Sequence, residues 1–282
     1  MSDYELILQT GRKLACASYG PQTGQPLLLF HGAPGSRLES HPDASVLNGL
    51  HIRLIVPDRP GYGLSTADPQ RTFLSWAEDL SQLMDHLAIE SCPILGFSGG
   101  GPYAMACAYA MPEKINRLGL VSSLAPFDNP FGTDGMNEQS KALFALAASD
   151  PDMFASQITG LVTDAEILYQ IMTAGLPAED QAVFASESMS RMYRADLAES
   201  VRHGVNGIVS DMLLYPKNWG FDPATIGCET MLWQGLKDIN VPPTMGKHLA
   251  ETIPGCKASF LPEQGHFLLF TYWKEILSQL MR

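Results

Sequence analysis

The sequence predicts an α/β protein with a mostly parallel central sheet, flanked by helices and carrying one inserted block of helices. In the first 125 residues, short continuous apolar runs alternate with longer amphipathic runs, and this alternation resumes after residue 221. Strand–helix–strand order requires crossover connections, so the strands are expected to be parallel. Between these parts the sequence reads only as helix. We therefore expect one core from residues 1–125 and 222–282, with a helical lid inserted at 126–221.

Composition limits the kind of protein. The chain has 282 residues, 45% hydrophobic and 17% charged, which fits a soluble globular protein with a sizeable core. A net charge of −12 argues against nucleic acid or anionic membranes as partners. No apolar run reaches the ~18 residues of a membrane span, and the first residues do not resemble a signal peptide. Five scattered cysteines favour reduced thiols in a cytoplasmic protein. The expected partner is a small-molecule substrate, and the oligomeric state stays open.

The individual elements follow from the apolar patterns. "ELILQT" and "KLACASYG" flank Gly11 and predict an antiparallel hairpin. Continuous apolar runs then predict buried strands, and period-3.6 patterns predict helices. The expected strands begin in segments 26–32, 51–63, 92–97, 117–123, 230–238 and 257–266, and the expected core helices are 72–89, 101–115, 242–254 and 267–282. In the insertion, helices are expected at 137–150, 164–175 and 179–204.

One short segment suggests catalysis. Gly96-Phe97-Ser98-Gly99-Gly100 matches G-x-S-x-G and stands between a predicted strand and a predicted helix. In such a turn the serine adopts a strained conformation, and side chains two residues before or after it would collide with nearby backbone. A chance match is the alternative, but the strand–helix context argues against it. Ser98 is therefore the candidate nucleophile.

An activated serine also needs donors for a developing oxyanion. Segment 31–35, His-Gly-Ala-Pro-Gly, directly follows a buried strand. We expect the N–H groups of Ala33 and Gly99 to form the oxyanion hole, with His31 and Gly32 supporting the loop. Gly32 would allow the chain to pass close to the serine. An ordinary glycine–proline turn is the structural alternative.

The base and the acid are expected late in the chain. His266 follows a predicted strand, and Asp238 stands in a turn after the preceding strand. The order Ser98, Asp238, His266 is the nucleophile–acid–base order of one architecture. Asp128 and Asp211 are competing candidates for the acid.

Together these motifs resemble the α/β-hydrolase superfamily, everywhere except in the insertion. The resemblance rests on "HGAPGS", "PDRPGYGLS", "GFSGGGPYA", "WQGLKD" and "EQGHF". It implies the α/β-hydrolase fold, with Ser98 as nucleophile, His266 as base and Asp238 as acid. Ala33 and Gly99 would be the oxyanion donors. The motifs imply neither a metal nor a nucleotide cofactor.

The favoured function is a serine hydrolase of small neutral carboxylic esters. Proline-type aminopeptidases share a His-Gly-x-Pro-Gly loop, but usually with glycine where this chain has Ala33. They also tend to carry Asp-Gln-Arg where segment 58–60 reads Asp-Arg-Pro. We interpret "PDRPGYGLS" (57–65) as a structural turn. A ligand-sensing protein that keeps the triad but turns over slowly is the third hypothesis.

The insertion gives two further hints. It contains thirteen acidic and five basic residues, a field that would tolerate or attract amines unless it is simply a solvated surface. Its apolar side chains would line an acyl pocket or pack on the sheet. These are Phe144, Phe154, Leu161, Ile167, Tyr169, Met172, Phe184, Met189, Met192 and Tyr193.

Overall fold

A single eight-stranded sheet runs through the computed structural model, which describes residues 1–128 and 132–282. The strands are β1 (Ser2–Ile7), β2 (Lys13–Tyr19), β3 (Gln25–Phe30), β4 (Ile52–Pro57), β5 (Cys92–Phe97), β6 (Ile115–Val121), β7 (Glu229–Gly235) and β8 (Lys257–Leu261). Their spatial order is β1-β2-β4-β3-β5-β6-β7-β8. The β1–β2 hairpin is antiparallel and β2 pairs antiparallel with β4, whereas the strands from β4 to β8 are parallel. The predicted α/β class is confirmed.

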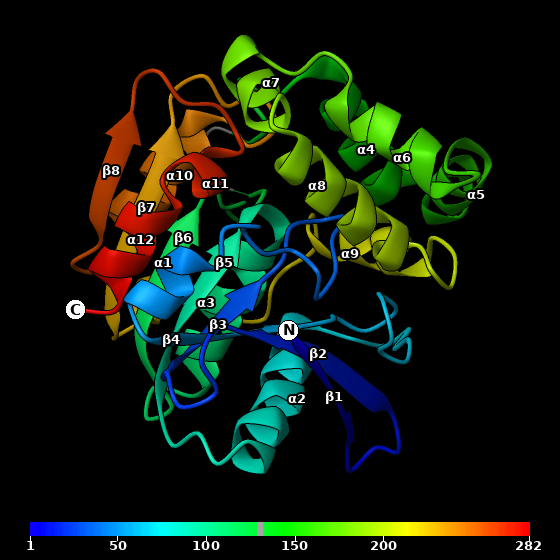
Figure 1. Ribbon diagram of the computed structural model, residues 1–282. Coiled ribbons are helices and arrows are strands. Elements are labelled where there is room, and N and C mark those ends of the chain that lie inside the picture. Colours follow the sequence, from blue (N-terminus) through cyan, green and yellow to red (C-terminus); the bar gives the residue numbers. More distant parts are fainter. Residues whose placement is uncertain (129–131) are drawn as a thin grey trace.

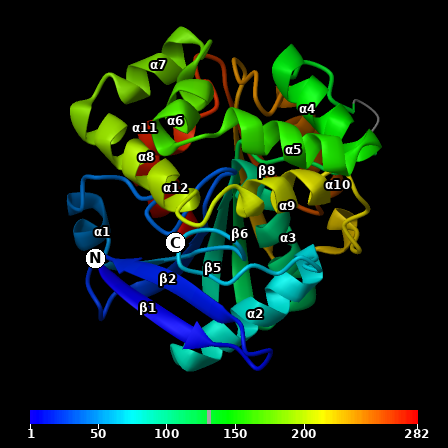
Figure 2. The same ribbon diagram turned by 90° about the vertical axis from the view of Figure 1, so that its right-hand side faces the viewer.

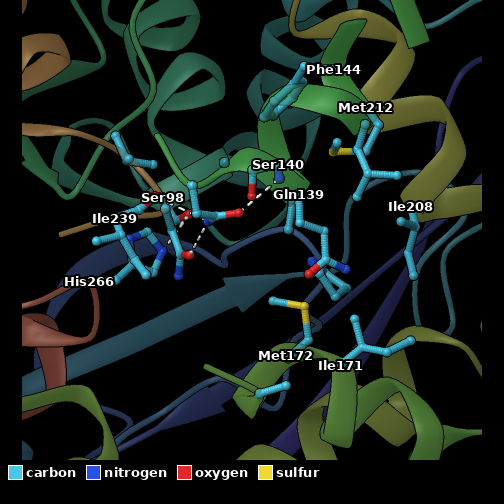
Figure 3. A pocket seen from close by; sticks show the side chains of 18 of the residues that line it. Ser98, Gln139, Ser140, Phe144, Ile171, Met172, Ile208, Met212, Ile239 and His266 are labelled. Carbon is cyan, nitrogen blue, oxygen red and sulfur yellow. Dashed lines mark hydrogen bonds between the residues drawn. The ribbon is translucent and has the colours of Figure 1, made fainter. Parts of the chain in front are cut away.

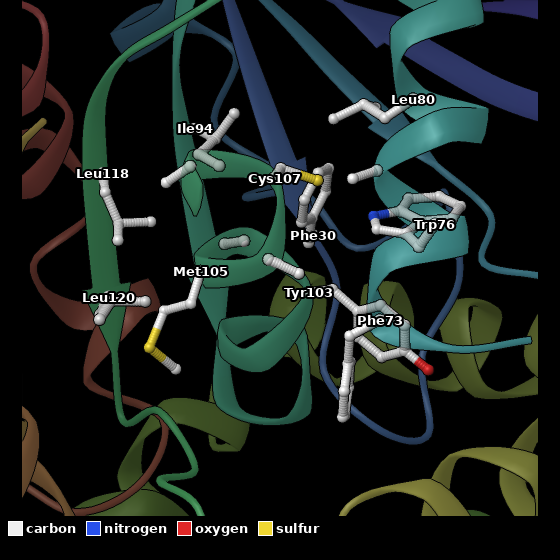
Figure 4. Packing of buried hydrophobic residues seen from close by; sticks show 14 of the residues in the cluster. Phe30, Phe73, Trp76, Leu80, Ile94, Tyr103, Met105, Cys107, Leu118 and Leu120 are labelled. Carbon is white, nitrogen blue, oxygen red and sulfur yellow. The ribbon is translucent and has the colours of Figure 1, made fainter. Parts of the chain in front are cut away.

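Helices cover both faces of this sheet. The helices outside the insertion are α1 (Ser45–Gly49), α2 (Phe73–His86), α3 (Gly101–Ala110), α10 (Pro243–Thr252), α11 (Leu268–Thr271) and α12 (Trp273–Leu280). Residues of α2, α3 and α10 share one buried apolar cluster, and residues of α1, α11 and α12 share the other. Figure 4 shows Phe73 and Trp76 of α2 packed beside Tyr103 of α3, over Phe30 of β3.

Two predicted helices of the core end or break earlier than expected. The helix expected at 101–115 stops at Ala110, because Pro112 disfavours helical backbone at Met111. The helix expected at 267–282 is divided at Tyr272 into α11 and α12. The first piece is buried, whereas α12 is amphipathic and packs on the sheet through one face.

The insertion joins β6 to β7. Its helices are α4 (Glu138–Ser149), α5 (Pro151–Leu161), α6 (Ala165–Thr173), α7 (Ala178–Phe184), α8 (Glu187–Ser200) and α9 (Asn206–Leu214). The expected helix 179–204 is divided into α7 and α8, while α5 and α9 were not predicted. Figures 1 and 2 show these green-to-yellow helices gathered over one edge of the sheet. The parallel strands β3, β5, β6 and β7 lead toward this edge, where their following loops lie.

In the described part of the chain no helix is both long and apolar enough to cross a membrane. All five cysteines are free thiols.

Candidate active site

Ser98 stands on a sharp turn between β5 and α3. Its φ is +52°, in the left-handed region that side chains rarely adopt. A Cβ on Gly96 would lie 2.7 Å from the Cα of Gly101, and one on Gly100 would lie 2.1 Å from the carbonyl oxygen of Phe30. The two glycines are thus required by close backbone contacts, as the sequence motif predicts. The turn presents the Ser98 hydroxyl to a cavity beyond the strand end.

The structure brings Ser98, His266 and Asp238 into a continuous hydrogen-bonded chain. The Ser98 Oγ is 3.0 Å from His266 Nε2, and His266 Nδ1 is 2.9 Å from Asp238 Oδ2. The other carboxylate oxygen of Asp238 accepts from the N–H groups of Asn240 and Val241, each at 2.9 Å. These donors orient the carboxylate toward the imidazole. The arrangement favours the tautomer in which His266 Nδ1–H donates to Asp238, which leaves Nε2 to accept from Ser98.

The competing acids lie elsewhere. Asp128 is exposed and shares no hydrogen bond with His266 among the described residues. Asp211 is buried in α9 between Arg59 and Arg71. Only Asp238 among these candidates contacts the imidazole.

The electrostatic surroundings favour a charged imidazole. Burial alone lowers the pKa of His266, but the negative charges of Asp238 and of Asp180 outweigh it. The pKa of His266 therefore lies above its ordinary value of 6.5. Such a shift stabilises the imidazolium that forms when the histidine takes up a proton.

The expected oxyanion donors lie beside each other. A Cβ placed on Gly99 would be 2.7 Å from the Cβ of Ala33, so the two peptide segments are in contact next to Ser98. Both residues line the same cavity as Ser98 and His266. A Cβ on Gly32 would meet Glu39 and Phe97 at 3.4 Å, an ordinary contact, so packing alone does not require glycine at this position. Gly35 is the crowded position of this loop, because a Cβ on it would lie 2.9 Å from the Gly32 carbonyl oxygen.

His31 is a fixed support of this loop. Its buried ring donates through Nδ1 to the carbonyl of Gly32 at 2.8 Å, and Nε2 accepts from the N–H of Arg59 at 3.3 Å. Burial and the nearby Arg59 lower the pKa of His31 well below 6.5, so the ring is neutral. This geometry agrees with the structural role expected for His31.

Arg59 joins the loop to the insertion, a connection that sequence reasoning missed. Its fully buried guanidinium donates to the carbonyls of His31 and Gly32 and pairs with Asp211 of α9 at 2.8 Å. Arg71 pairs with the other oxygen of Asp211. The two guanidinium groups outweigh burial and lower the pKa of Asp211 to about 2. The segment 57–65 is structural, as expected, but its partner comes from the far end of the insertion.

Two buried carboxyl groups bind the same loop, Glu39 from the core and Asp196 from the insertion. Glu39 accepts from the Gly32 N–H at 3.1 Å, and Asp196 of α8 accepts from the N–H and hydroxyl of Ser36 at 2.8 and 2.7 Å. Burial raises the pKa of Asp196 to about 8, and burial together with Asp196 raises the pKa of Glu39. The sequence had suggested a solvated acidic surface for the insertion. This is wrong for Asp180, Asp196 and Asp211, which are all buried.

Ser98 and His266 border a cavity of ≈ 440 Å³ between the sheet edge and the insertion. Figure 3 shows these two residues on one side, facing Met172, Ile171, Ile208 and Met212 across the cavity. The remaining lining residues are mostly apolar: Leu124, Leu143, Phe144, Ile158, Leu161, Val162, Leu168, Leu176, Ile239 and Val241, among others. The described lining contains no Lys or Arg, and its one carboxylate is Glu138. A cavity of this size suits a small organic molecule.

Of the ten apolar insertion residues considered for an acyl pocket, three line this cavity: Phe144, Leu161 and Met172. Most of the others pack against one another or against the sheet. Tyr193, for example, stacks on Phe184, and the ring centroids of Phe184 and Phe267 are 4.8 Å apart. Among the described residues no group of three or more His, Cys, Asp or Glu side chains could hold a metal ion.

Comparisons with known proteins agree with this architecture. A 2-hydroxymuconate semialdehyde hydrolase of Pseudomonas putida is 26% identical over 92% of this chain and 88% of its own length. An uncharacterized hydrolase of Bacillus subtilis is 31% identical, but the match covers only 36% of this chain and 35% of that protein. The crystal structure of a bromoperoxidase from Bacillus anthracis superposes with a TM-score of 0.75 at 22% identity, covering 99% of this chain and 98% of that one. This last similarity concerns the fold alone.

The relatives' names support hydrolytic activity. The family model for the alpha/beta hydrolase fold matches residues 25–271, which span both parts of the sheet and the whole insertion. On this match, and on the strand order and turn described above, the chain belongs to the α/β-hydrolase family.

Proposed function

We propose that this protein is a serine hydrolase that cleaves a neutral carboxylic ester with an apolar acyl group, through an acyl-enzyme on Ser98. The observation that carries the proposal is the chain of hydrogen bonds from Ser98 through His266 to Asp238, at 3.0 and 2.9 Å, on the wall of an apolar cavity. Nucleophile, base and orienting acid are within the distances that proton transfer needs.

The reaction follows from this geometry. His266 Nε2 accepts the Ser98 proton as Oγ attacks the ester carbonyl, and Asp238 stabilises the imidazolium that forms. The N–H groups of Ala33 and Gly99 would bind the oxyanion of the tetrahedral intermediate. The imidazolium then protonates the leaving alcohol, and the acyl group remains on Ser98. A water molecule, deprotonated by His266, releases the carboxylic acid and restores the serine.

The cavity lining supports a neutral substrate. An anionic substrate would need a cationic partner, and the described lining offers no Lys or Arg. An aminopeptidase would need a carboxylate for the free amine. The one carboxylate of the lining, Glu138, is largely exposed and pairs with Lys141 at 2.8 Å. The aminopeptidase alternative therefore loses the feature that would favour it.

Labelling with a fluorophosphonate probe tests the proposal, together with turnover of p-nitrophenyl acetate, butyrate and octanoate. Wild type should be labelled and turn over repeatedly. Ser98→Ala and His266→Ala should each lose activity, by roughly 10⁶-fold in kcat when the triad acts as a unit. A folded wild type that is not labelled would contradict the proposal. Labelling with one slow turnover and retained product would instead favour the ligand-sensing alternative.

A cavity variant tests the acyl site separately. Met172 faces Ser98 across the cavity, so Met172→Trp should reduce turnover of octanoate more than that of acetate. Met153→Trp is a matched control on the neighbouring helix α5, because Met153 is exposed. Equal losses for both esters in Met172→Trp would show that the acyl chain does not occupy this part of the cavity.

A further inference from the structure

Helix α7 of the insertion places a carboxylate against the backbone that carries His266. Asp180 Oδ2 accepts from the His266 N–H at 3.0 Å, and Oδ1 accepts from the Phe267 N–H at 2.8 Å. The Asp180 side chain is buried, with 1% of the residue exposed. A carboxylate that accepts two adjacent backbone N–H groups fixes both peptide planes. The insertion thus holds the loop that presents the imidazole.

Neighbouring residues are shaped to this contact. A Cβ on Gly265 would lie 2.3 Å from Asp180 Oδ2, so glycine leaves room for the carboxylate. On the same helix, Glu179 pairs with Lys237, the residue before Asp238, and Lys237 also pairs with Glu263 at 2.6 Å. Helix α7 therefore contacts the loops of both the histidine and the acid.

A residue of the core binds the carbonyl group of His266. The hydroxyl of Ser122, directly after β6, donates to the His266 carbonyl at 2.9 Å. The backbone of His266 is thus bound by an uncharged group from the sheet and by a charged group from the insertion. This difference in charge makes the two contacts separable by experiment.

We propose that Asp180 is a positioning residue, which fixes the backbone of His266 so that its ring spans Ser98 and Asp238, and whose charge favours the imidazolium. The inference rests on the proposed function. It makes helix α7 part of the catalytic apparatus, although no residue of this helix lines the cavity. Movement of α7 would withdraw the carboxylate and misplace the base.

The charges around His266 fit this role. Asp238 faces the ring from the loop after β7, and Asp180 faces its backbone from α7. Lys237, Glu179 and Glu263 form an ion-pair group on the outer side of the two loops. Burial alone lowers the pKa of His266, and Asp180 adds to Asp238 in raising it. Loss of the Asp180 charge should therefore lower the pKa of His266.

Asp180→Asn is the first test, with Ser122→Ala as its uncharged counterpart on the same backbone. Displacement of a catalytic group by about 1 Å can cost on the order of 100-fold in rate, so both variants should lower kcat/KM by about 10- to 100-fold. Only Asp180→Asn should also move the acid limb of the pH–rate profile to lower pH. Asp164→Asn is the matched control, because Asp164 is an exposed N-cap of α6 and asparagine also caps helices.

An NMR titration of the His266 ring measures the same effect without a substrate. In Asp180→Asn its pKa should fall, whereas in Ser122→Ala it should not. If wild type hydrolyses no ester but this difference is found, the proposed function fails and the effect of Asp180 on His266 stands. An unchanged rate in Asp180→Asn, or a lower rate with an unmoved acid limb and an unmoved His266 pKa, would overturn the inference.

A second variant guards against a failure to fold. Gly265→Ala should displace the Asp180 carboxylate through the new methyl group and lower kcat/KM. In an Asp180→Ala background, where the atoms that the methyl group would meet are absent, the same change should cost little more, because the two positions act through one contact. Fully additive losses would show that Gly265 and Asp180 act independently, against the inference.

Discussion

The buried carboxylate of Asp211 should be a main determinant of stability, and Asp211→Asn tests this. Asp211 accepts from the guanidinium groups of Arg59 and Arg71 and from the hydroxyls of Tyr62 and Tyr103. All five side chains are buried. The neutral amide would leave two buried cations without their counter-charge and would turn an NH₂ group toward donors.

Two estimates bracket the expected loss. Breaking a buried ion pair by removing one partner costs about 3–5 kcal/mol. The fall in the pKa of Asp211 from 3.8 to about 2 corresponds to about 2 kcal/mol of preferential stabilisation of the carboxylate. The value derived from the pKa is smaller because protonation of Asp211 only removes the charge, whereas Asp211→Asn also places an NH₂ group beside the surrounding donors. We expect Asp211→Asn to lower the free energy of unfolding at pH 7 by about 3 kcal/mol or more.

Urea denaturation of wild type and variant, from pH 7 downward, measures this difference. The folded-state pKa of Asp211 is lowered, so its contribution is present above pH 3.8 and is lost as the pH falls from there toward 2. The gap between the two proteins should therefore narrow over that range. Tyr62→Phe removes a single donor to the carboxylate and should cost about 1.5–3 kcal/mol. A loss below 1 kcal/mol for Asp211→Asn, or a gap that does not change with pH, would refute the reasoning.

Three further predictions follow from single contacts. The kcat/KM of ester hydrolysis should fall as the pH drops through a value above 6.5, because the raised pKa of His266 sets the pH below which the base is protonated. A pH–rate profile whose acid limb has its midpoint below pH 6.5 would contradict this. Gly100→Ala should destabilise the protein by about 3 kcal/mol or prevent folding, since the new methyl group would lie 2.1 Å from a backbone carbonyl oxygen. Gly160→Ala in α5 is the control: its methyl group would have no neighbour within 4 Å, so this variant should be neutral or slightly stabilised in thermal unfolding. Tyr215→Phe removes the hydrogen bond to the Gly99 carbonyl at 3.0 Å and should cost about 1 kcal/mol in urea denaturation, with a few-fold lower kcat if the turn that follows Ser98 loosens.

Local chemistry explains why much of this site was predictable from sequence. Glycine at position 96 is required by the turn itself, and glycine at position 100 by the Phe30 carbonyl of the neighbouring strand β3, so the requirement of the turn is visible in a five-residue motif. Asp238 and His266 each follow a strand of the parallel sheet, and the ends of such strands meet at one edge. Strand position therefore placed both side chains near Ser98 before any distance was known.

Pairings over long separations were not predictable in this way. Arg59 and Asp211 are 152 residues apart, and Asp180 and His266 are 86 apart. The insertion has thirteen acidic residues, and a single sequence does not distinguish those on exposed helix faces from those turned inward. Helical periodicity also did not separate residues that line the cavity, such as Met172, from residues that pack beside it, such as Tyr193. Both positions demand an apolar side chain.

The buried acids of the insertion have a common physical role. Asp211 neutralises the arginine that holds the carbonyls of His31 and Gly32, Asp196 binds the backbone of Ser36 in the same loop, and Asp180 binds the backbone of His266. A buried carboxylate is costly without such partners, so each of these contacts strongly favours one placement of its helix. The candidate oxyanion loop and the loop of His266 are thus both positioned by acidic side chains of the insertion. The insertion therefore acts on the geometry of the candidate catalytic groups as well as on the shape of the cavity above them.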